Sequence, residues 1–275
     1  MTTKTVPASC RRTIVFASLL LFFGALAYNN WALSPTYNPE LPAASAFVSE
    51  YSVPSEPHSA IFRGMDAASG VLVAIATLMV GAHRHLLRVS GRVTRYMAPP
   101  EGWSILAWLG ALLFGIATLA DAIFPMTCTL STLSPAEAAA PPCVGPLASA
   151  HDITSTLAGA GAIIALVATT LLLGRYYGKS WHRAPMMWAF ILLALCHVVS
   201  ASYTFVAALM PGLPFLGYVQ RLSIAALSLW AILMVLTPTG RALLEGRHRV
   251  ASQSLSHVLI RATGQTAPSP EPART

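Results

Sequence analysis

The chain has 275 residues, of which 55% are hydrophobic and only 10% are charged, and its mean hydropathy is +0.61. A soluble domain needs more charge to cover its surface, so this composition excludes one and favours a protein whose helices lie in lipid. The net charge of +7 and the pI near 9.6 fit anionic lipid headgroups. They do not indicate nucleic acid, because no basic helix carries interleaved aromatic stacking residues.

Six apolar runs of about 20 residues follow one another along the chain, each long enough to cross a hydrocarbon layer of roughly 30 Å. Since unpaired backbone groups are not tolerated in lipid and no alternating barrel pattern is present, all six are expected to be helices. The expected spans are residues 13–31, 64–82, 103–124, 153–173, 186–209 and 216–236. The predicted fold is therefore an all-α polytopic membrane helix bundle with six transmembrane helices.

The first run follows Arg11 and Arg12 and ends near Ala25-Leu26-Ala27, as a secretory signal peptide does. Its apolar stretch of about 18 residues is longer than the usual signal core of about 7 to 15, which favours an uncleaved anchor. Cleavage would leave five transmembrane helices, each in the same membrane orientation as before.

Basic residues mark one side of the membrane. Most Lys and Arg residues fall in segments that alternation places on the same side, namely Lys4, Arg11, Arg12, Arg84, Arg88, Arg92, Arg95, Arg175, Lys179, Arg183, Arg241, Arg247, Arg249, Arg261 and Arg274. By the positive-inside rule that side is cytoplasmic, and both termini lie there (N-in/C-in). The predicted divisions are a cytoplasmic N-terminus (1–12), a six-helix transmembrane domain (13–236) and a cytoplasmic tail (237–275) that is disordered after about residue 250.

Two connections on the external side are distinctive. The longer one, residues 32–62, holds five prolines and several aromatic residues, and it either folds back as a cap over the bundle or stays a disordered loop. The other holds Cys128 and Cys143, which are expected to form a disulfide in an oxidising compartment, worth about 3 kcal/mol for a loop of about 15 residues. Metal binding by the two thiolates is the alternative, which their spacing does not favour because it is not a zinc-ribbon pattern.

Polar side chains gather toward the external ends of the predicted helices, where they are expected to form an outward-facing polar pocket. The predicted pocket residues are Arg63, Asp66, Asp121, His151, Asp152, Ser155, His197, Gln220 and Arg221. An ionisable group within a span costs about 2.5–3.5 kcal/mol, so such groups usually face the bundle interior or a wet cavity. The alternative is that Arg63 pairs with Asp66, and Arg221 with Asp121 or Asp152, only to join helix ends.

Three stretches of the chain carry a family resemblance. They are Asp121-Ala122-Ile123-Phe124-Pro125-Met126-Thr127-Cys128, the stretch from Cys143 through His151-Asp152 to Ser155, and Gly217-Tyr218-Val219-Gln220-Arg221. From the first helix to about Leu236 the chain resembles bacterial six-helix membrane proteins catalogued as domain of unknown function 998, which are distantly similar to the DRAM and Sfk group. The resemblance implies a six-helix fold in the bacterial inner (plasma) membrane, and it implies no activity.

Three functional classes fit these observations, and the sequence does not decide whether the protein is an enzyme. The preferred one is handling of envelope lipids, with Arg63 and Arg221 binding a headgroup phosphate. The second is a membrane hydrolase in which Asp121, His151 and His197 hold a metal ion such as zinc. The third is a proton-coupled transporter that uses the same three residues as a relay. We assign no cofactor, because the chain lacks two histidines at helical spacing on one external segment, and the ligand and protein partners stay open.

Overall fold

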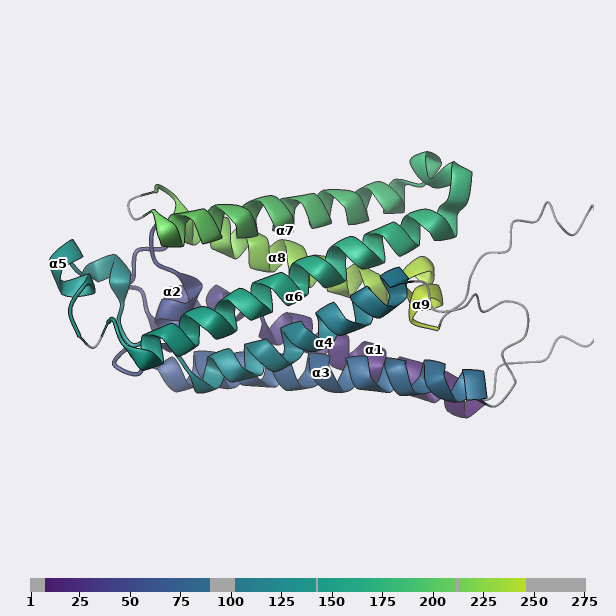
Figure 1. The fold of residues 1–275 in the computed structure, drawn as a ribbon, viewed down its shortest axis with the longest axis horizontal. Helices are drawn as coiled ribbons and strands as arrows, with labels where there is room; N and C mark the ends of the chain where they lie inside the picture. Colours follow the sequence, from purple (N-terminus) through teal and green to yellow (C-terminus); the bar gives the residue numbers. More distant parts are fainter. Residues whose placement is uncertain (1–7, 90–101, 142, 211–212, 246–275) are drawn as a thin grey trace, which may run out of the picture.

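The computed structural model describes residues 8–89, 102–141, 143–210 and 213–245, which form helices, turns and loops without a β-strand (Figure 1). The long helices are α1 (Ala8–Ala27), α3 (Ser59–Val89), α4 (Gly102–Ile123), α6 (Pro146–Tyr177), α7 (Pro185–Leu209) and α8 (Leu216–Leu236). Five are long and apolar enough to cross a membrane, and α1 makes a sixth if it is counted with the short helices after it, from which it is bent by 45°. The predicted all-α membrane bundle is confirmed.

The six long helices form a ring in which each helix packs against two neighbours. Their order around the ring is α1, α3, α4, α6, α7, α8 and back to α1. Helices α4 and α6 pack most closely, because Gly110 and Gly161 lie at their contact. A Cβ atom on Gly161 would lie 2.5 Å from the backbone nitrogen of Phe114, and one on Gly110 would lie 2.6 Å from that of Ala165. Small residues such as glycine let the backbones of two membrane helices come into direct contact.

Several helix ends differ from the predicted spans. Helix α3 begins at Ser59 and α6 at Pro146, before the predicted starts at 64 and 153, so their first turns carry polar side chains. Helix α1 ends at Ala27, whereas residue 31 was expected. The side chain of Asn29 donates to the carbonyl of Ala25 (2.8 Å), and this local hydrogen bond competes with continuation of the helix.

Residues 28–58, between α1 and α3, form a folded segment that we call the cap. It contains η1 (Asn30–Leu33), α2 (Ser34–Tyr37) and η2 (Val48–Ser52). A buried cluster joins it to two helices, and its members are Leu41, Ala46, Val48 and Tyr51 with Phe62 of α3 and Ile224 of α8. Of the two expectations for residues 32–62, a cap and a disordered loop, the structure has the cap.

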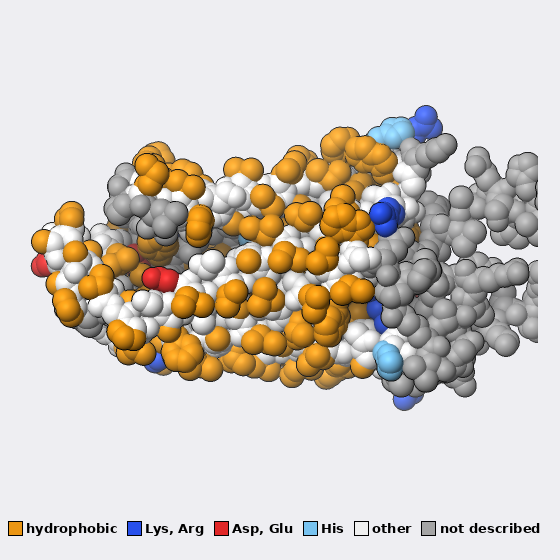
Figure 2. Space-filling model, viewed as in Figure 1, with side chains coloured by type: hydrophobic (Ala, Val, Ile, Leu, Met, Phe, Trp, Pro, Cys, Tyr) orange, Lys and Arg blue, Asp and Glu red, His pale blue; other side chains and the backbone are white. Residues whose placement is uncertain are grey.

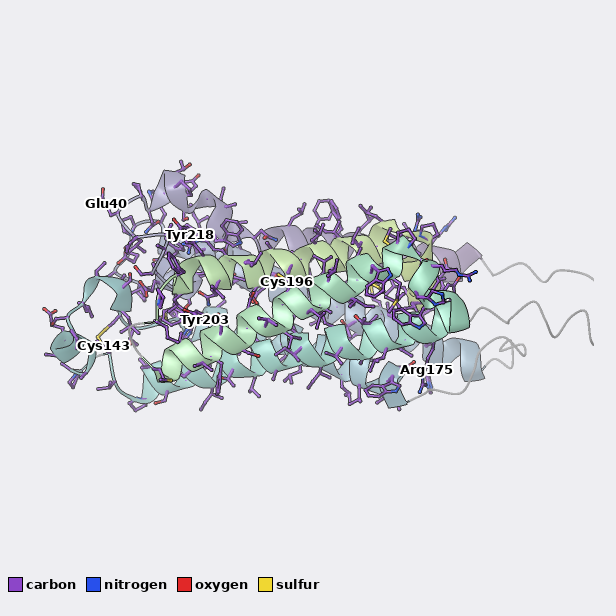
Figure 3. The ribbon with its side chains drawn as sticks, turned by 90° about the horizontal axis from the view of Figure 1, so that it is seen from above. Glu40, Cys143, Arg175, Cys196, Tyr203 and Tyr218 are labelled. Atoms are coloured by element: carbon purple, nitrogen blue, oxygen red, sulfur yellow. A yellow bond between two sulfur atoms is a disulfide. The ribbon has the colours of Figure 1, made fainter. Side chains whose placement is uncertain are left out.

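The connection between α4 and α6, which we call the disulfide loop, contains η3 (Leu130–Thr132) and α5 (Pro135–Ala138). Cys128 and Cys143 form a disulfide with their Cα atoms 5.3 Å apart, as predicted. The loop contacts the cap, since Thr129 donates to the carboxylate of Glu56 (2.5 Å) and Ser131 donates to that of Glu50. Figure 3 shows Cys143 at one extremity of the molecule and Arg175 toward the other.

The cap and the disulfide loop lie at one end of the bundle, which we call the cap end. The opposite end holds η4 (Gly178–Arg183), α9 (Pro238–Leu244) and most of the described basic residues, among them Arg12, Arg84, Arg175, Arg183 and Arg241. Figure 2 shows most of the visible Lys and Arg side chains at this opposite end. The assignment of that end to the cytoplasm and the division of the chain at residues 12 and 236 stay predictions. Residues 1–7 and the predicted disorder after about residue 250 lie outside the described residues.

Candidate functional site

Three ionisable residues from three helices form what we call the acidic cluster: Asp66 of α3, Asp121 of α4 and His151 of α6. His151 Nδ1 lies 3.0 Å from Asp121 Oδ1. The same carboxylate oxygen accepts hydrogen bonds from Thr154 Oγ1 (2.7 Å) and Ser155 Oγ (2.8 Å). Side chains from the first three turns of α6 thus lie against the end of α4, and His151 among them belongs to the part of the helix that precedes the predicted span.

The contacts of His151 determine which of its ring nitrogens carries the proton. Nδ1 lies near Asp121 Oδ1 and also 3.1 Å from the carbonyl oxygen of Phe124, and both are acceptors, so Nδ1 is the donor. All hydrogen bonds to Asp121 from the described residues fall on Oδ1. Its second oxygen, Oδ2, is left able to accept a hydrogen bond from a ligand.

Asp66 is fixed by a residue that the sequence interpretation overlooked. Asn30, in the cap, is almost fully buried and donates from Nδ2 to Asp66 Oδ1 (2.7 Å) and to the carbonyl oxygen of Phe62 (3.2 Å). Asp66 is close enough to Asp121 and His151 to interact with them electrostatically. The side chain of Tyr28 is likewise within reach of the charges of both Asp66 and Asp121.

An apolar cavity of about 90 Å³ lies in the middle of the ring, toward the interior from the acidic cluster. Its lining comes from α1, α3, α4, α6 and α8 and includes Leu21, Val73, Phe114, Ala162, Leu166, Leu227 and Ala231. Tyr28 also lines it, and its ring packs edge-on against Phe114 with centroids 5.1 Å apart. Tyr28 therefore lines the cavity within electrostatic range of the acidic cluster.

Gln220 and Arg221, predicted as pocket residues, hold the cap on α8. The side-chain carbonyl of Gln220 accepts from the backbone N–H of Val48 (2.6 Å). Arg221 is buried, donates to the carbonyl oxygens of Ala43 (2.7 Å) and Ala46 (3.4 Å), and also donates to the Tyr51 hydroxyl. The run Gly217–Arg221, which carries part of the family resemblance, thus has a structural role at this end of α8.

The charge pairs proposed as the alternative to a pocket are wrong. Arg221 contacts cap carbonyls in place of Asp121 or Asp152, and among the described side chains no ion pair joins Arg63 to Asp66. Arg63 is half-buried, and its Nε has no hydrogen-bond partner within the described ranges. Asp152 is exposed on α6 and does not contact Asp121.

His197 is separate from the acidic cluster. It is buried between α7 and α8, where Nδ1 lies 3.0 Å from both the hydroxyl and the carbonyl oxygen of Ser223, and its Nε2 has no partner among the described residues. It contacts neither Asp121 nor His151, so the three residues suggested as metal ligands or as a relay do not come together. Within the described ranges no group of three or more His, Cys, Asp or Glu residues is placed to hold a metal ion.

Glu50 is a second buried residue that sequence patterns did not reveal. Its carboxylate, fully shielded in the cap, accepts hydrogen bonds from the backbone N–H groups of Phe47 (3.3 Å) and Ser131 (3.2 Å). Burial raises the pKa of Glu50, although these hydrogen bonds favour its ionised form.

Asn30 and Tyr28 could have been suspected, because both are polar residues inside the predicted first span. Glu50 lies in a polar, Pro-rich connection and gave no such signal.

Comparison with known proteins agrees with the fold and adds no activity. Residues 15–237 match the family model described as Protein of unknown function (DUF998). The match runs from α1 to the end of α8 and includes the acidic cluster, the disulfide loop and the cap. No curated protein and no solved structure matches the chain.

Proposed function

The chain belongs to the DUF998 family of proteins of unknown function, and from its site geometry we propose that this integral membrane protein binds an envelope lipid. The lipid headgroup lies at the acidic cluster, and part of a hydrocarbon chain occupies the central cavity. The observation that carries this proposal is the position of Tyr28, which lines the apolar cavity and lies within electrostatic range of both Asp66 and Asp121.

The arrangement along the helices supports an amphiphilic ligand. On α3, Asp66 is followed by Ser69 and then by Val73, which lines the cavity. On α6, His151 and Ser155 are followed by Ala162, two turns farther on. At 1.5 Å per residue, polar and apolar binding groups thus lie within about 10 Å of each other. A cavity lined by apolar groups tends to exclude water and to accept apolar ligands.

We place the cap end outside the cell and the acidic cluster at the outer leaflet of a plasma membrane. Support comes from the charge distribution, because just two described Lys or Arg residues, Arg63 and Arg221, lie at the cap end. The positive-inside rule assigns such an end to the non-cytoplasmic side. A disulfide in the loop at this end also suits an oxidising compartment.

Native mass spectrometry of the purified protein tests lipid binding. Wild-type protein is expected to retain a lipid, and Ala231→Leu, which narrows the cavity, is expected to reduce the bound fraction severalfold. Ala225→Leu is the matched control, since Ala225 is equally half-buried on the same helix and does not line the cavity. Wild-type protein without lipid, or equal occupancy in the two variants, would contradict the proposal.

A further inference from the structure

The acidic cluster brings two carboxyl groups and one imidazole together in a place where charge is expensive. Asp66 lies within electrostatic range of Asp121, and His151, which pairs with Asp121, is the one basic side chain in ion-pair contact with the cluster's carboxylates among the described residues. Arg221 is occupied by the cap, and Arg63, one turn of α3 away from Asp66, is not paired with it. Two carboxyl groups buried close together in a membrane are costly to ionise, so a cationic ligand group, which stabilises their ionised form, would be favoured here.

A buried hydroxyl next to the cluster also has no partner among the described residues. Ser69 lies three residues after Asp66 on α3 and is 0% exposed, and its Oγ makes no hydrogen bond within the part of the chain that the structure describes. It is one of the residues that line the central cavity. Buried polar groups are normally hydrogen-bonded, so this hydroxyl points to a ligand at the junction between the cluster and the cavity.

The groups at this junction are mainly hydrogen-bond acceptors. Asp121 Oδ2 accepts nothing from the described residues, and Asp66 accepts on Oδ1 from Asn30. The hydroxyls of Tyr28 and Ser69 can accept as well. A primary ammonium group has three N–H donors, no acceptor and a positive charge, and it matches this set. A headgroup that ends in an anionic phosphate, with no ammonium group to pair with the carboxylates, would be repelled by them.

We propose that the lipid bound at this site carries a primary ammonium headgroup, which Asp66 and Asp121 hold at the entrance of the apolar cavity. This inference rests on the proposed lipid binding and specifies the chemistry of the ligand. It replaces the expectation that Arg63 and Arg221 would hold a headgroup phosphate.

A competition between headgroups tests the inference. The full-length protein in detergent is incubated with equimolar phosphatidylethanolamine, phosphatidylcholine and phosphatidylglycerol of identical acyl chains, and native mass spectrometry identifies what stays bound. The bound amount of phosphatidylethanolamine is expected to exceed that of each other lipid by about tenfold. One charge-assisted hydrogen bond changes an affinity by about this factor. Phosphatidylcholine is the informative competitor, since its cation has no N–H donor.

Asparagine variants assign the preference to the two carboxylates. Asp66→Asn and Asp121→Asn keep the side-chain shape and are each expected to bring the three lipids close to equal retention. Asp152→Asn removes an exposed negative charge from the same end of α6 and is expected to keep the wild-type preference. Equal retention by wild-type protein, or a preference that survives both cluster variants, overturns the headgroup assignment while lipid binding stands.

A soluble competitor distinguishes an amphiphile from a small amine. Glycerophosphoethanolamine has the same headgroup without acyl chains and is expected not to displace the bound lipid at equal concentration. If it competes as well as the lipid, the ammonium site stands and the role of the cavity in lipid binding is refuted. If the protein retains none of the three lipids, the proposed function itself fails.

Discussion

Arg221 keeps a positive charge buried at the cap end of the bundle without a carboxylate partner. Its guanidinium donates to two cap carbonyls and to Tyr51, and its Cζ lies 5.5 Å from the centre of the Tyr51 ring. Carbonyl oxygens and an aromatic face carry partial negative charge, so they stabilise the cation in a site from which water is excluded. A guanidinium group presents several N–H donors in a fixed planar arrangement, which explains why Arg and not Lys occupies this position.

Arg221→Lys is therefore expected to destabilise the cap although it preserves the charge. A single ammonium group cannot reach Ala43 and Tyr51 at once, and losing hydrogen bonds of this type should lower the free energy of unfolding by about 2 kcal/mol. Hydrogen exchange in residues 41–51 should become faster. Arg241→Lys changes an exposed arginine in the same way and should leave both measurements unchanged.

Glu50 should make the stability of the protein depend on pH. Burial raises its pKa in the folded protein, so folding takes up a proton between the ordinary Glu pKa of about 4.3 and the raised value. The free energy of unfolding is then largest below that interval and falls as the pH rises through it. Melting temperatures across this range should fall less steeply for Glu50→Gln than for wild-type protein.

An exposed residue of the cap provides the control for this pH experiment. Glu40 lies on the surface, and Glu40→Gln should retain the wild-type pH profile. Identical slopes for wild-type protein and Glu50→Gln would show that Glu50 titrates alike in the folded and unfolded protein.

At the scale of helices, the contact between α4 and α6 depends on the absence of side chains. Gly161→Leu places side-chain atoms where the backbone of α4 lies, and it should lower the free energy of unfolding by at least about 3 kcal/mol. Gly159→Leu is the matched control on the same helix, because a Cβ there meets no atom within 4 Å. Size-exclusion chromatography after graded heating should show early loss of the monodisperse peak for Gly161→Leu alone.

The disulfide should stabilise its loop with little effect on the helices. Cys128 and Cys143 are separated by 15 residues, for which the chain-entropy model gives about 3 kcal/mol. The double variant Cys128→Ser with Cys143→Ser should show faster hydrogen exchange around η3 and α5 and unchanged exchange in α4 and α6. Acceleration that spreads through both helices would mean that the bond supports the bundle itself.

The sequence predicted the helices far better than the site. Hydropathy located α8 at residues 216–236, the bounds that the structure has, because its apolar run and its helix coincide. It placed the starts of α3 and α6 too late, because both helices begin before their apolar stretches do. The grouping of Asp66, Asp121 and His151 followed from their shared position at helix ends. The anchoring role of Arg221 could not be predicted, because its partners are backbone carbonyls more than 170 residues away in the chain.

At the scale of the whole molecule, the charge distribution predicts which end faces the cytoplasm. Glu137 is exposed in the disulfide loop, and Arg241 is exposed at the opposite end. In intact cells, a membrane-impermeant maleimide should label the variant Glu137→Cys and should label Arg241→Cys only after permeabilisation. Wild-type protein measures the background from Cys10 and Cys196. Labelling with the reverse pattern would invert the topology and place the acidic cluster at the inner leaflet.

Both cysteines of the disulfide belong to the same connection, and this has a mechanical consequence. The bond closes the α4–α6 connection on itself and leaves the cap covalently independent of it. Where the two segments meet in the described structure, hydrogen bonds to Glu50 and Glu56 join them. Separating the connection from the cap would therefore break these hydrogen bonds and leave the disulfide intact.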